Sequence, residues 1–330
     1  MIRVGLIGTG WVARYHAQAY QRLEGATLAG VADQDYSKAQ SFARRYSAVA
    51  HPLVADLLTS EVEVVDICTP TPTHKDLAVR AMGLGKHVLC EKPIARTLDE
   101  AEAMVEAAHK AGVKFMVAHV SRFEADHRLA KEVIERGDIG QPRMGWQAIV
   151  GPFPGWSSEG WFADFAASGG PLLDLAIHSF DYLNWIFGSQ VRSIYALGIR
   201  QRIHLETHTL SLLRYEDGGM ALVEASWAMP TGSPLLVRTE LVGEAGVIRW
   251  DSQSTMSLRL MKEGGAHQDF VPVAEDGFTA EIRHFLECVR DGKPPLVSGE
   301  EAIAALRVSL AAIESMTTRR PVTLLPDAQG

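Results

Sequence analysis

Two places in the sequence carry residues whose types and spacing could perform acid–base chemistry. The first is the tripeptide of Glu91, Lys92 and Pro93, which directly follows the short apolar run 88–90. Proline has no N–H group for a β ladder, so we expect a strand to end here with Lys92 beyond its carboxyl end. Ligands of open α/β sheets bind beyond these ends, so the ammonium group could face a substrate and stabilise a developing negative charge. A surface Lys–Glu pair is the alternative for this motif taken alone.

The second place is the pair Asp174 and His178, which lie four positions apart within the mostly apolar run 172–187. A buried helix is expected to begin near Pro171, because proline is favoured in the first turn. Asp174, His178 and Asp181 then lie on one stripe of that helix. An imidazole titrates near neutral pH and suits a general base, whereas an ordinary core histidine is the alternative. Asp and His supply two ligands and no third is evident, so no metal site is predicted.

The elements that must position these residues begin with a cofactor-binding turn. Residues 2–7 read as a β-branched strand that runs into Gly8-x-Gly10-x-x-Ala13, followed by an amphipathic helix. Gly8 permits a tight turn, Gly10 lets a pyrophosphate approach the backbone, and Ala13 lets the helix pack on the strand. The helix N-terminus would offer its N–H groups and its dipole to the phosphates. This pattern predicts a dinucleotide-binding fold.

Asp33 indicates which dinucleotide is bound. It follows the second expected strand, 27–32, and lies twenty positions after Ala13, which is the spacing of a carboxylate that accepts hydrogen bonds from the adenosine ribose. A carboxylate repels a 2′-phosphate, and Gln34 rather than an arginine follows it. We therefore predict NAD as the cofactor, with NADP disfavoured. The alternative for Asp33 is that it caps the helix expected over 36–46.

A regular alternation of strands and helices continues along the first third of the chain. Further strands are expected over 62–68, 88–90 and 114–118. Residues 1–118 should therefore form a doubly wound parallel sheet, the Rossmann arrangement, with the loops after its strands along one rim. The first of these loops contains Thr69, Pro70 and His74, which should lie beside the glycine turn. His74 could face the cofactor or cap the next helix.

Residues 119–330 should form a second domain of the α+β class. Strands are expected over 144–150, 191–197, 208–215, 220–227, 235–242 and 247–250, and helices over 122–136, 279–290 and 299–316. The strands partly alternate apolar with polar residues, which is typical of a mostly antiparallel sheet that is covered on one face. A hairpin turn at 216–219 fits that arrangement.

The composition excludes several classes of partner. The chain of 330 residues carries a formal net charge of −8, which argues against nucleic acid because such a partner needs a basic face. No run of about 18 apolar residues indicates a membrane span, and the strand at 2–7 leaves no place for a signal peptide. Cys68, Cys90 and Cys288 form no Cys-x-x-Cys pair, which suggests a reducing compartment, and we expect the cytoplasm.

Three segments together resemble the Gfo/Idh/MocA oxidoreductase family, to which inositol dehydrogenases and glucose–fructose oxidoreductase belong. They are the glycine turn at 8–13, Gly-Lys-His-Val-Leu-Cys-Glu-Lys-Pro at 85–93, and Gly-Gly-x-Leu-Leu-Asp-x-x-x-His at 169–178. The resemblance implies a Rossmann domain followed by an α+β domain with a large open sheet, often used for homo-dimer or homo-tetramer contacts. It implies the catalytic set Lys92, Asp174 and His178. The residues implied around the dinucleotide are Gly8, Gly10, Trp11, Val12, Asp33, Thr69, Pro70, His74, Glu91 and Lys92.

We therefore expect NAD-dependent oxidation of a hydroxyl group on a sugar, a sugar derivative or an inositol-like polyol. His178 is the expected base, Asp174 would orient the substrate, and Lys92 would stabilise the alkoxide, although Lys92 could also be the proton acceptor. An NAD-assisted glycoside hydrolase and a non-catalytic dinucleotide-sensing regulator are the alternatives. The residues expected at the substrate are Lys92, His119, Arg122, Trp161, Asp174 and His178, with Trp146 and Trp156 as further candidates.

Overall fold

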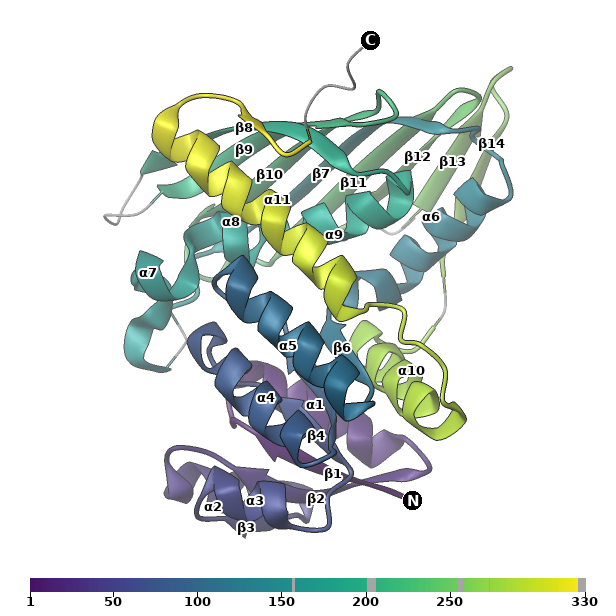
Figure 1. Ribbon diagram of the computed structural model, residues 1–330. Coiled ribbons are helices and arrows are strands. Elements are labelled where there is room, and N and C mark those ends of the chain that lie inside the picture. The colour runs from purple at the N-terminus through teal and green to yellow at the C-terminus, as the bar shows by residue number, and fades with distance from the viewer. Residues whose placement is uncertain (156–157, 201–205, 255–257, 273, 326–330) are drawn as a thin grey trace. The chain divides into compact units, whose positions relative to one another are not determined.

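The computed structural model describes residues 1–155, 158–200, 206–254, 258–272 and 274–325 (Figure 1). The chain divides into two compact units, and each contains its own β-sheet. The first unit consists of residues 1–123 with 275–303, and the second consists of residues 124–274 with 304–330.

The first unit is built on a six-stranded sheet whose paired strands are all parallel. The strands are β1 (Ile2–Ile7), β2 (Ala26–Ala32), β3 (Val49–His51), β4 (Val64–Ile67), β5 (His87–Glu91) and β6 (Phe115–Ala118). Their order, β3-β2-β1-β4-β5-β6, changes direction between β1 and β4. Ligands of such sheets bind at the carboxyl edge beside this change of direction. The glycine turn that follows β1 therefore lies at the edge where a cofactor is expected.

Helices pack around this sheet, and one of them comes from late in the chain. They are α1 (Trp11–Arg22), α2 (Tyr36–Tyr46), α3 (Val54–Thr59), α4 (His74–Gly83), α5 (Leu98–Ala111) and α10 (Gly277–Asp291), with the 3-10 turns η1 (Thr71–Thr73) and η2 (Val120–Phe123). α10 packs against α1, where the rings of Phe278 and Tyr15 stack with centroids 5.0 Å apart. The predicted division at residue 118 had placed this helix in the second domain. Its apolar contact with α1 explains why the first compact unit includes it.

The second unit is built on a nine-stranded sheet that is mostly antiparallel. Its strands are β7 (Pro142–Pro152), β8 (Val191–Arg200), β9 (Glu206–Tyr215), β10 (Met220–Met229), β11 (Leu236–Gly243), β12 (Gly246–Asp251), β13 (Leu258–Lys262), β14 (His267–Phe270) and β15 (Val322–Thr323). The order is β14-β13-β12-β11-β7-β10-β9-β8-β15. Among the described strands of this second sheet, only β7 and β10 pair in parallel.

Helices cover one face of this second sheet (Figure 1). The helices of this part of the chain are α6 (Ala125–Glu135), η3 (Ser158–Ala163), α7 (Phe165–Ser168), α8 (Gly170–Asp174), α9 (Ala176–Phe187) and α11 (Gly299–Thr318), of which the last begins in the first unit. The core lies between helices and sheet, where Phe180 and Leu183 of α9 join Leu213 of β9 and Val308 of α11. Buried and exposed residues alternate along β9 and β10, because a half-buried strand alternates its side chains.

The predicted fold class is confirmed, since a parallel Rossmann sheet precedes a mostly antiparallel open one. The prediction missed the short elements β3, α3, α7, β13, β14 and β15 and the 3-10 turns η1 and η3. The single helix expected from Pro171 to the end of the apolar run is wrong, because it consists of α8 and α9. They meet at Leu175, where the N–H of His178 donates to the carbonyl of Leu175, one residue closer than in an α-helix. Within the described residues, no helix combines the length and the apolar character that crossing a membrane requires.

Candidate active site

The glycine turn after β1 has the geometry that the sequence predicted. Gly8 has a φ of +92°, and a Cβ atom at this position would lie 2.6 Å from the carbonyl oxygen of Cys68. The Gly8 N–H donates to the carbonyl of Ala32 at 2.8 Å, which ties the turn to the end of β2. Only glycine combines this left-handed backbone with the absence of a side chain.

Gly10 serves the turn in a different way. It is the N-cap of α1, no side chain caps this helix, and a Cβ atom built at Gly10 would have no atom within 4 Å. Trp11 is exposed and Val12 is partly buried in the first turn that follows. A helix start of this kind, uncapped and with open space at its first residue, fits the approach of a pyrophosphate.

Asp33 is held in place at the end of β2. Its Oδ2 accepts hydrogen bonds from the backbone N–H of Thr9 at 2.8 Å and from the Thr9 hydroxyl at 2.7 Å, and its Oδ1 accepts from the N–H of Asp35 at 2.9 Å. The helix cap of α2 is Asp35, whose carboxylate accepts from the N–H of Ser37. Asp33 is therefore not the cap. Oδ1 retains an acceptor site, which fits a hydrogen bond from the ribose diol of NAD.

The threonine–proline loop after β4 lies against the glycine turn, and His74 after it is buried. A Cβ atom at Gly8 would lie 3.0 Å from the Thr69 side chain, and Pro70 is exposed. His74 is fully buried, with Nδ1 2.9 Å from the carbonyl oxygen of Pro93 and Nε2 2.8 Å from that of Thr69. His74 bridges two loops of the rim, and its cofactor contact stays a prediction. Its alternative as a helix cap is not observed.

Glu91 and Lys92 occupy the carboxyl end of β5. Oε2 of Glu91 accepts from the backbone N–H of Lys92 at 3.0 Å, and Oε1 lies 3.3 Å from Nε2 of His16. Glu91 is buried beside Lys92, and its contact with the dinucleotide stays a prediction. The side chain of Lys92 is partly exposed, and its peptide bond to Pro93 is cis.

Asp174 and His178 belong to the second unit, at the end of α8 and in the first turn of α9. Both are partly exposed, whereas Leu173 and Ile177 beside them are fully buried. The apolar neighbours fix the two helices, and the two polar side chains are left at the surface of this packed layer. Asp181, the third polar residue of the predicted stripe, is fully buried.

The residues predicted at the substrate have different surroundings. Arg122 is 2% exposed, and its guanidinium donates to Glu301 at 2.8 Å and to the carbonyl of Leu296 at 3.2 Å. The structure places Arg122 in a buried ion pair, and its contact with substrate stays a prediction. His119 is fully buried after β6, and Trp161 is partly buried and packs on Phe162.

The two further tryptophan candidates can be placed only in part. Trp146 alternates along β7 with Gly145 and Gln147, and a Cβ atom on Gly145 would contact Leu183 of α9. Trp146 therefore lies on the sheet face that α9 does not cover. Trp156 lies outside the described residues.

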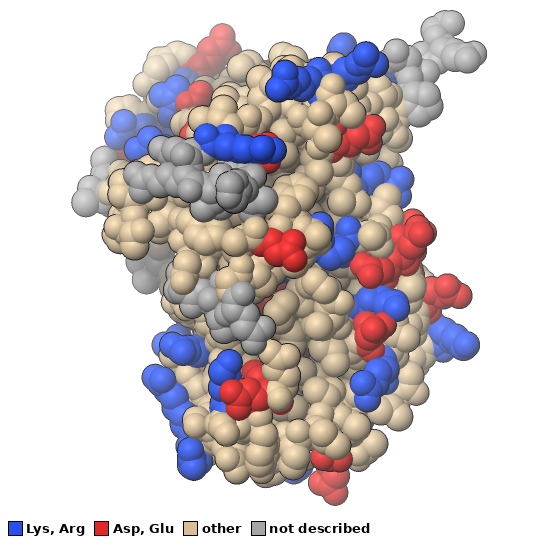
Figure 2. Space-filling view, turned by 90° about the vertical axis from the view of Figure 1, so that its left-hand side faces the viewer, with Lys and Arg blue, Asp and Glu red and all other residues tan. Residues whose placement is uncertain are grey.

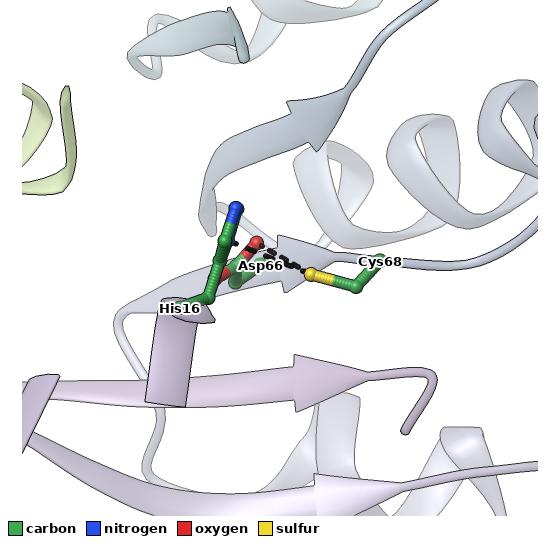
Figure 3. A group of neighbouring side chains, drawn as sticks. All are labelled: His16, Asp66 and Cys68. Carbon is green, nitrogen blue, oxygen red and sulfur yellow. Dashed lines mark hydrogen bonds and ion pairs between the residues drawn. The ribbon is translucent and has the colours of Figure 1, made fainter. Parts of the chain in front are cut away.

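A buried polar group that the sequence analysis missed lies beneath the rim (Figure 3). His16 of α1 points toward Asp66 of β4 and Cys68, and their side-chain donor atoms lie within 4.8 Å of one another. Nδ1 of His16 is 2.9 Å from Asp66, whose Oδ2 also accepts from the Tyr20 hydroxyl at 2.9 Å. These are hydrogen-bond distances, so the group forms a hydrogen-bonded network. A carboxylate inside the apolar run 64–67 was the signal that could have revealed it.

Comparisons with known proteins agree with this geometry. A family model described as "Oxidoreductase family, NAD-binding Rossmann fold" (GFO_IDH_MocA) matches residues 2–119, and its companion "Oxidoreductase family, C-terminal alpha/beta domain" matches residues 131–324. The scyllo-inositol 2-dehydrogenase (NAD(+)) of Bacillus subtilis is 29% identical over 98% of this chain and 96% of its own length. The myo-inositol 2-dehydrogenase of Thermotoga maritima is 28% identical over 98% of both. A probable dehydrogenase from Thermotoga maritima, solved by crystallography, has a TM-score of 0.85 at 27% identity and covers 98% of this chain and 99% of that one.

Proposed function

We propose that this chain, which belongs to the Gfo/Idh/MocA oxidoreductase family, oxidises a secondary hydroxyl group of an inositol-like polyol or a sugar with NAD as hydride acceptor. The observation that carries the proposal is the rim of the first unit. There an open glycine turn, a fixed carboxylate and a partly exposed lysine follow strands β1, β2 and β5 of one sheet. Two relatives named as inositol 2-dehydrogenases support the polyol class.

The residues divide the work of the reaction between them. NAD, when bound, accepts the hydride from the substrate carbon. His178 takes the hydroxyl proton, since an imidazole suits general-base work near neutral pH. Asp174, on the preceding turn, orients the substrate hydroxyls and favours the protonated imidazole. The ammonium of Lys92 stabilises the alkoxide as it forms, and it is the second candidate for proton acceptor.

The test uses Lys92→Ala and His178→Ala separately, with Lys75→Ala as the matched control. Lys75 is a surface lysine of α4 that pairs with Asp76 at 2.7 Å. NADH absorbance is followed with a panel of inositols, sugars and sugar lactones, and NAD binding is measured by calorimetry. The proposal requires both variants to lose turnover while NAD still binds. It fails if both keep the turnover of the control, or if nitrophenyl glycosides release their chromophore without net NADH, which would indicate a glycoside hydrolase.

The open face of the second sheet supports a homo-oligomer. Leu210 and Leu212 of β9 are 39% and 51% exposed, and they pair across strands with Leu197 of β8 and Leu222 of β10. An exposed apolar area of neighbouring side chains favours contact with a second copy of the chain. In sedimentation velocity, Leu212→Glu with Leu222→Glu should yield monomers, whereas Leu84→Glu, at a similarly exposed leucine of the first unit, should not.

Charge and cysteine chemistry support the remaining expectations about partners and compartment. On the face shown in Figure 2, basic and acidic side chains are intermixed among neutral residues, which does not suit nucleic acid. Cys68, Cys90 and Cys288 are all buried free thiols. Buried free thiols suit a reducing compartment, and we place the enzyme in the cytoplasm.

A further inference from the structure

The carboxylate beneath Lys92 is held by a histidine that the proposed reaction does not use. His16 of α1 has a fully buried side chain, with Nδ1 2.9 Å from Oδ2 of Asp66 and Nε2 3.3 Å from Oε1 of Glu91. Glu91 is itself only 11% exposed at its side chain. Each ring nitrogen of His16 therefore faces one carboxylate oxygen.

This arrangement determines the charge of the imidazole. A neutral ring has one nitrogen with an N–H group and one with a lone pair. With a carboxylate near each nitrogen, a neutral ring would leave its lone pair close to a negatively charged oxygen. The imidazolium has an N–H group on both nitrogens: Nδ1 is hydrogen-bonded to Asp66, and Nε2 lies within ion-pair distance of Glu91 without a hydrogen bond. Burial lowers the pKa of His16, but the charge of Asp66 and the hydrogen bonds to Asp66 and Cys68 outweigh it, so that pKa lies well above its usual value.

The other groups around His16 are consistent with a cation. The Tyr20 hydroxyl of α1 donates to Asp66, and Cys68 Sγ lies 3.5 Å from both His16 and Asp66. Burial, followed by the charge of Asp66, raises the pKa of the Cys68 thiol, so it stays neutral. From α10, the ring of Phe278 lies 5.8 Å from that of His16, and the buried Glu281 adds a further carboxylate near Tyr20.

The network reaches the backbone of the catalytic lysine through one further hydrogen bond. Oε2 of Glu91 accepts from the N–H of Lys92 at 3.0 Å. A continuous line of polar contacts therefore runs from Asp66 through His16 and Glu91 to Lys92. Glu91 can hold this position only if its buried charge is compensated, because an unpaired buried carboxylate shifts to its neutral form or moves to water.

We propose that His16 is a positioning residue: its imidazolium holds Glu91 in the buried, ionised position that orients the backbone at Lys92. This inference rests on the proposed function, since it matters for turnover only if Lys92 acts on the substrate. The effect belongs to the chemical step, because Lys92 acts on the alkoxide as it forms, whereas Asp66, His16 and Glu91 are not placed against the substrate.

The kinetic test combines His16→Gln, Glu91→Gln and the double variant. His16→Gln leaves Glu91 without its cation, and kcat should fall on the order of 10²-fold, the size expected when a catalytic group is displaced. Glu91→Gln keeps an oxygen for the Lys92 N–H and removes the charge, so the double variant should recover at least about tenfold over His16→Gln. A purely structural loss predicts the opposite, since a second buried substitution would lower activity further.

Two controls separate the possible failures. His127→Gln replaces another buried histidine, in the second unit. This variant should retain kcat even if its melting temperature falls as much as that of His16→Gln. Lys92→Ala tests the proposed function itself. If Lys92→Ala is inactive while His16→Gln has the wild-type kcat, the positioning role is overturned and the proposed function stands. If Lys92→Ala keeps full turnover, both fall.

A direct readout needs no turnover. In protein labelled with 15N-histidine and free of cofactor, the signals that disappear in His16→Gln identify His16. We expect both of its ring nitrogens to carry protons at pH 7.5, and to keep them to a higher pH than exposed histidines. A neutral His16 tautomer at pH 7.5 would overturn the inference whatever the kinetic result. This measurement also covers the case in which a kinetic variant folds poorly.

Discussion

The hydroxyl of Thr9 donates to Oδ2 of Asp33 at 2.7 Å, and the Thr9 backbone N–H donates to the same oxygen at 2.8 Å. Thr9 lies between the two glycines of the turn, so the turn itself fixes the acid at the end of β2. The N–H of Asp35 donates to the other oxygen at 2.9 Å. The carboxylate is therefore oriented by three donors before any cofactor binds.

This fixed carboxylate should decide the preference between NAD and NADP. Replacing Asp33→Ser together with Gln34→Arg removes the repulsion of a 2′-phosphate and adds a cation for it. We expect kcat/KM to fall at least about tenfold for NAD and to rise for NADP, since a charged hydrogen bond contributes about 1.5–3 kcal/mol. The measurement is the ratio of kcat/KM values with the two cofactors. An unchanged ratio would show that Asp33 does not contact the ribose.

The features that could be predicted from sequence are those encoded by local spacing. Gly8 and Gly10 differ from other glycines because a strand precedes them and a helix follows. Asp33 could be identified because it lies twenty positions after Ala13 of this turn. Each of these inferences needs only one β–α–β segment, whose geometry is nearly invariant.

The features that could not be predicted depend on partners that are distant in sequence. Arg122 looks like a surface cation, but its partner Glu301 is 179 residues away and buries it. His74 has a carbonyl partner 19 residues later, at Pro93. Spacing along the chain does not show which buried groups meet. The same limit applies to Asp33 and Asp35, because both can cap a helix by sequence and only the backbone angles decide.

Gly8→Ala and Gly10→Ala should affect different properties. An added Cβ at Gly8 would lie 2.6 Å from a backbone carbonyl oxygen at a φ of +92°, whereas at Gly10 it would have no atom within 4 Å. Gly8→Ala should therefore lower the free energy of unfolding by more than about 1–2 kcal/mol. Gly10→Ala should leave it nearly unchanged and weaken NAD binding. Urea unfolding of the cofactor-free protein and calorimetric titration with NAD measure the two effects, and a similar stability loss in both would contradict this assignment.

His74→Phe should weaken the rim of the first unit. The substitution keeps an aromatic ring but leaves the carbonyl oxygens of Thr69 and Pro93 without their contact to the imidazole. We expect the free energy of unfolding to fall by about 1–3 kcal/mol, the cost of unsatisfied buried polar groups, and kcat to fall because Pro93 follows Lys92. His109→Phe is the control, since that side chain is 72% exposed. Equal losses of stability and kcat in the two variants would contradict the role of His74 as a bridge between Thr69 and Pro93.

His127 should control part of the acid sensitivity of the second unit. Its ring packs edge-on against Tyr182 and Trp250, and Nε2 lies 3.3 Å from the Gln147 amide nitrogen. Burial lowers the pKa of His127 to about 3. The unfolded chain takes up this proton near the ordinary histidine pKa of about 6.5, whereas the folded protein does not. The unfolded state therefore binds more protons between these two values, and stability should fall as the pH falls through this window, by up to about 1.4 kcal/mol per pH unit.

His127→Gln removes this proton uptake and keeps a polar side chain beside Gln147. The free energy of unfolding of the variant, measured in urea from pH 7.5 to 4.5, should decline less steeply with falling pH than that of the wild type. The difference in slope should approach one proton below pH 6, because carboxylates and the other histidines are the same in both proteins. Parallel curves would mean that His127 is already protonated in the folded state, and the aromatic contacts of Tyr182 and Trp250 would then have to accommodate a buried cation.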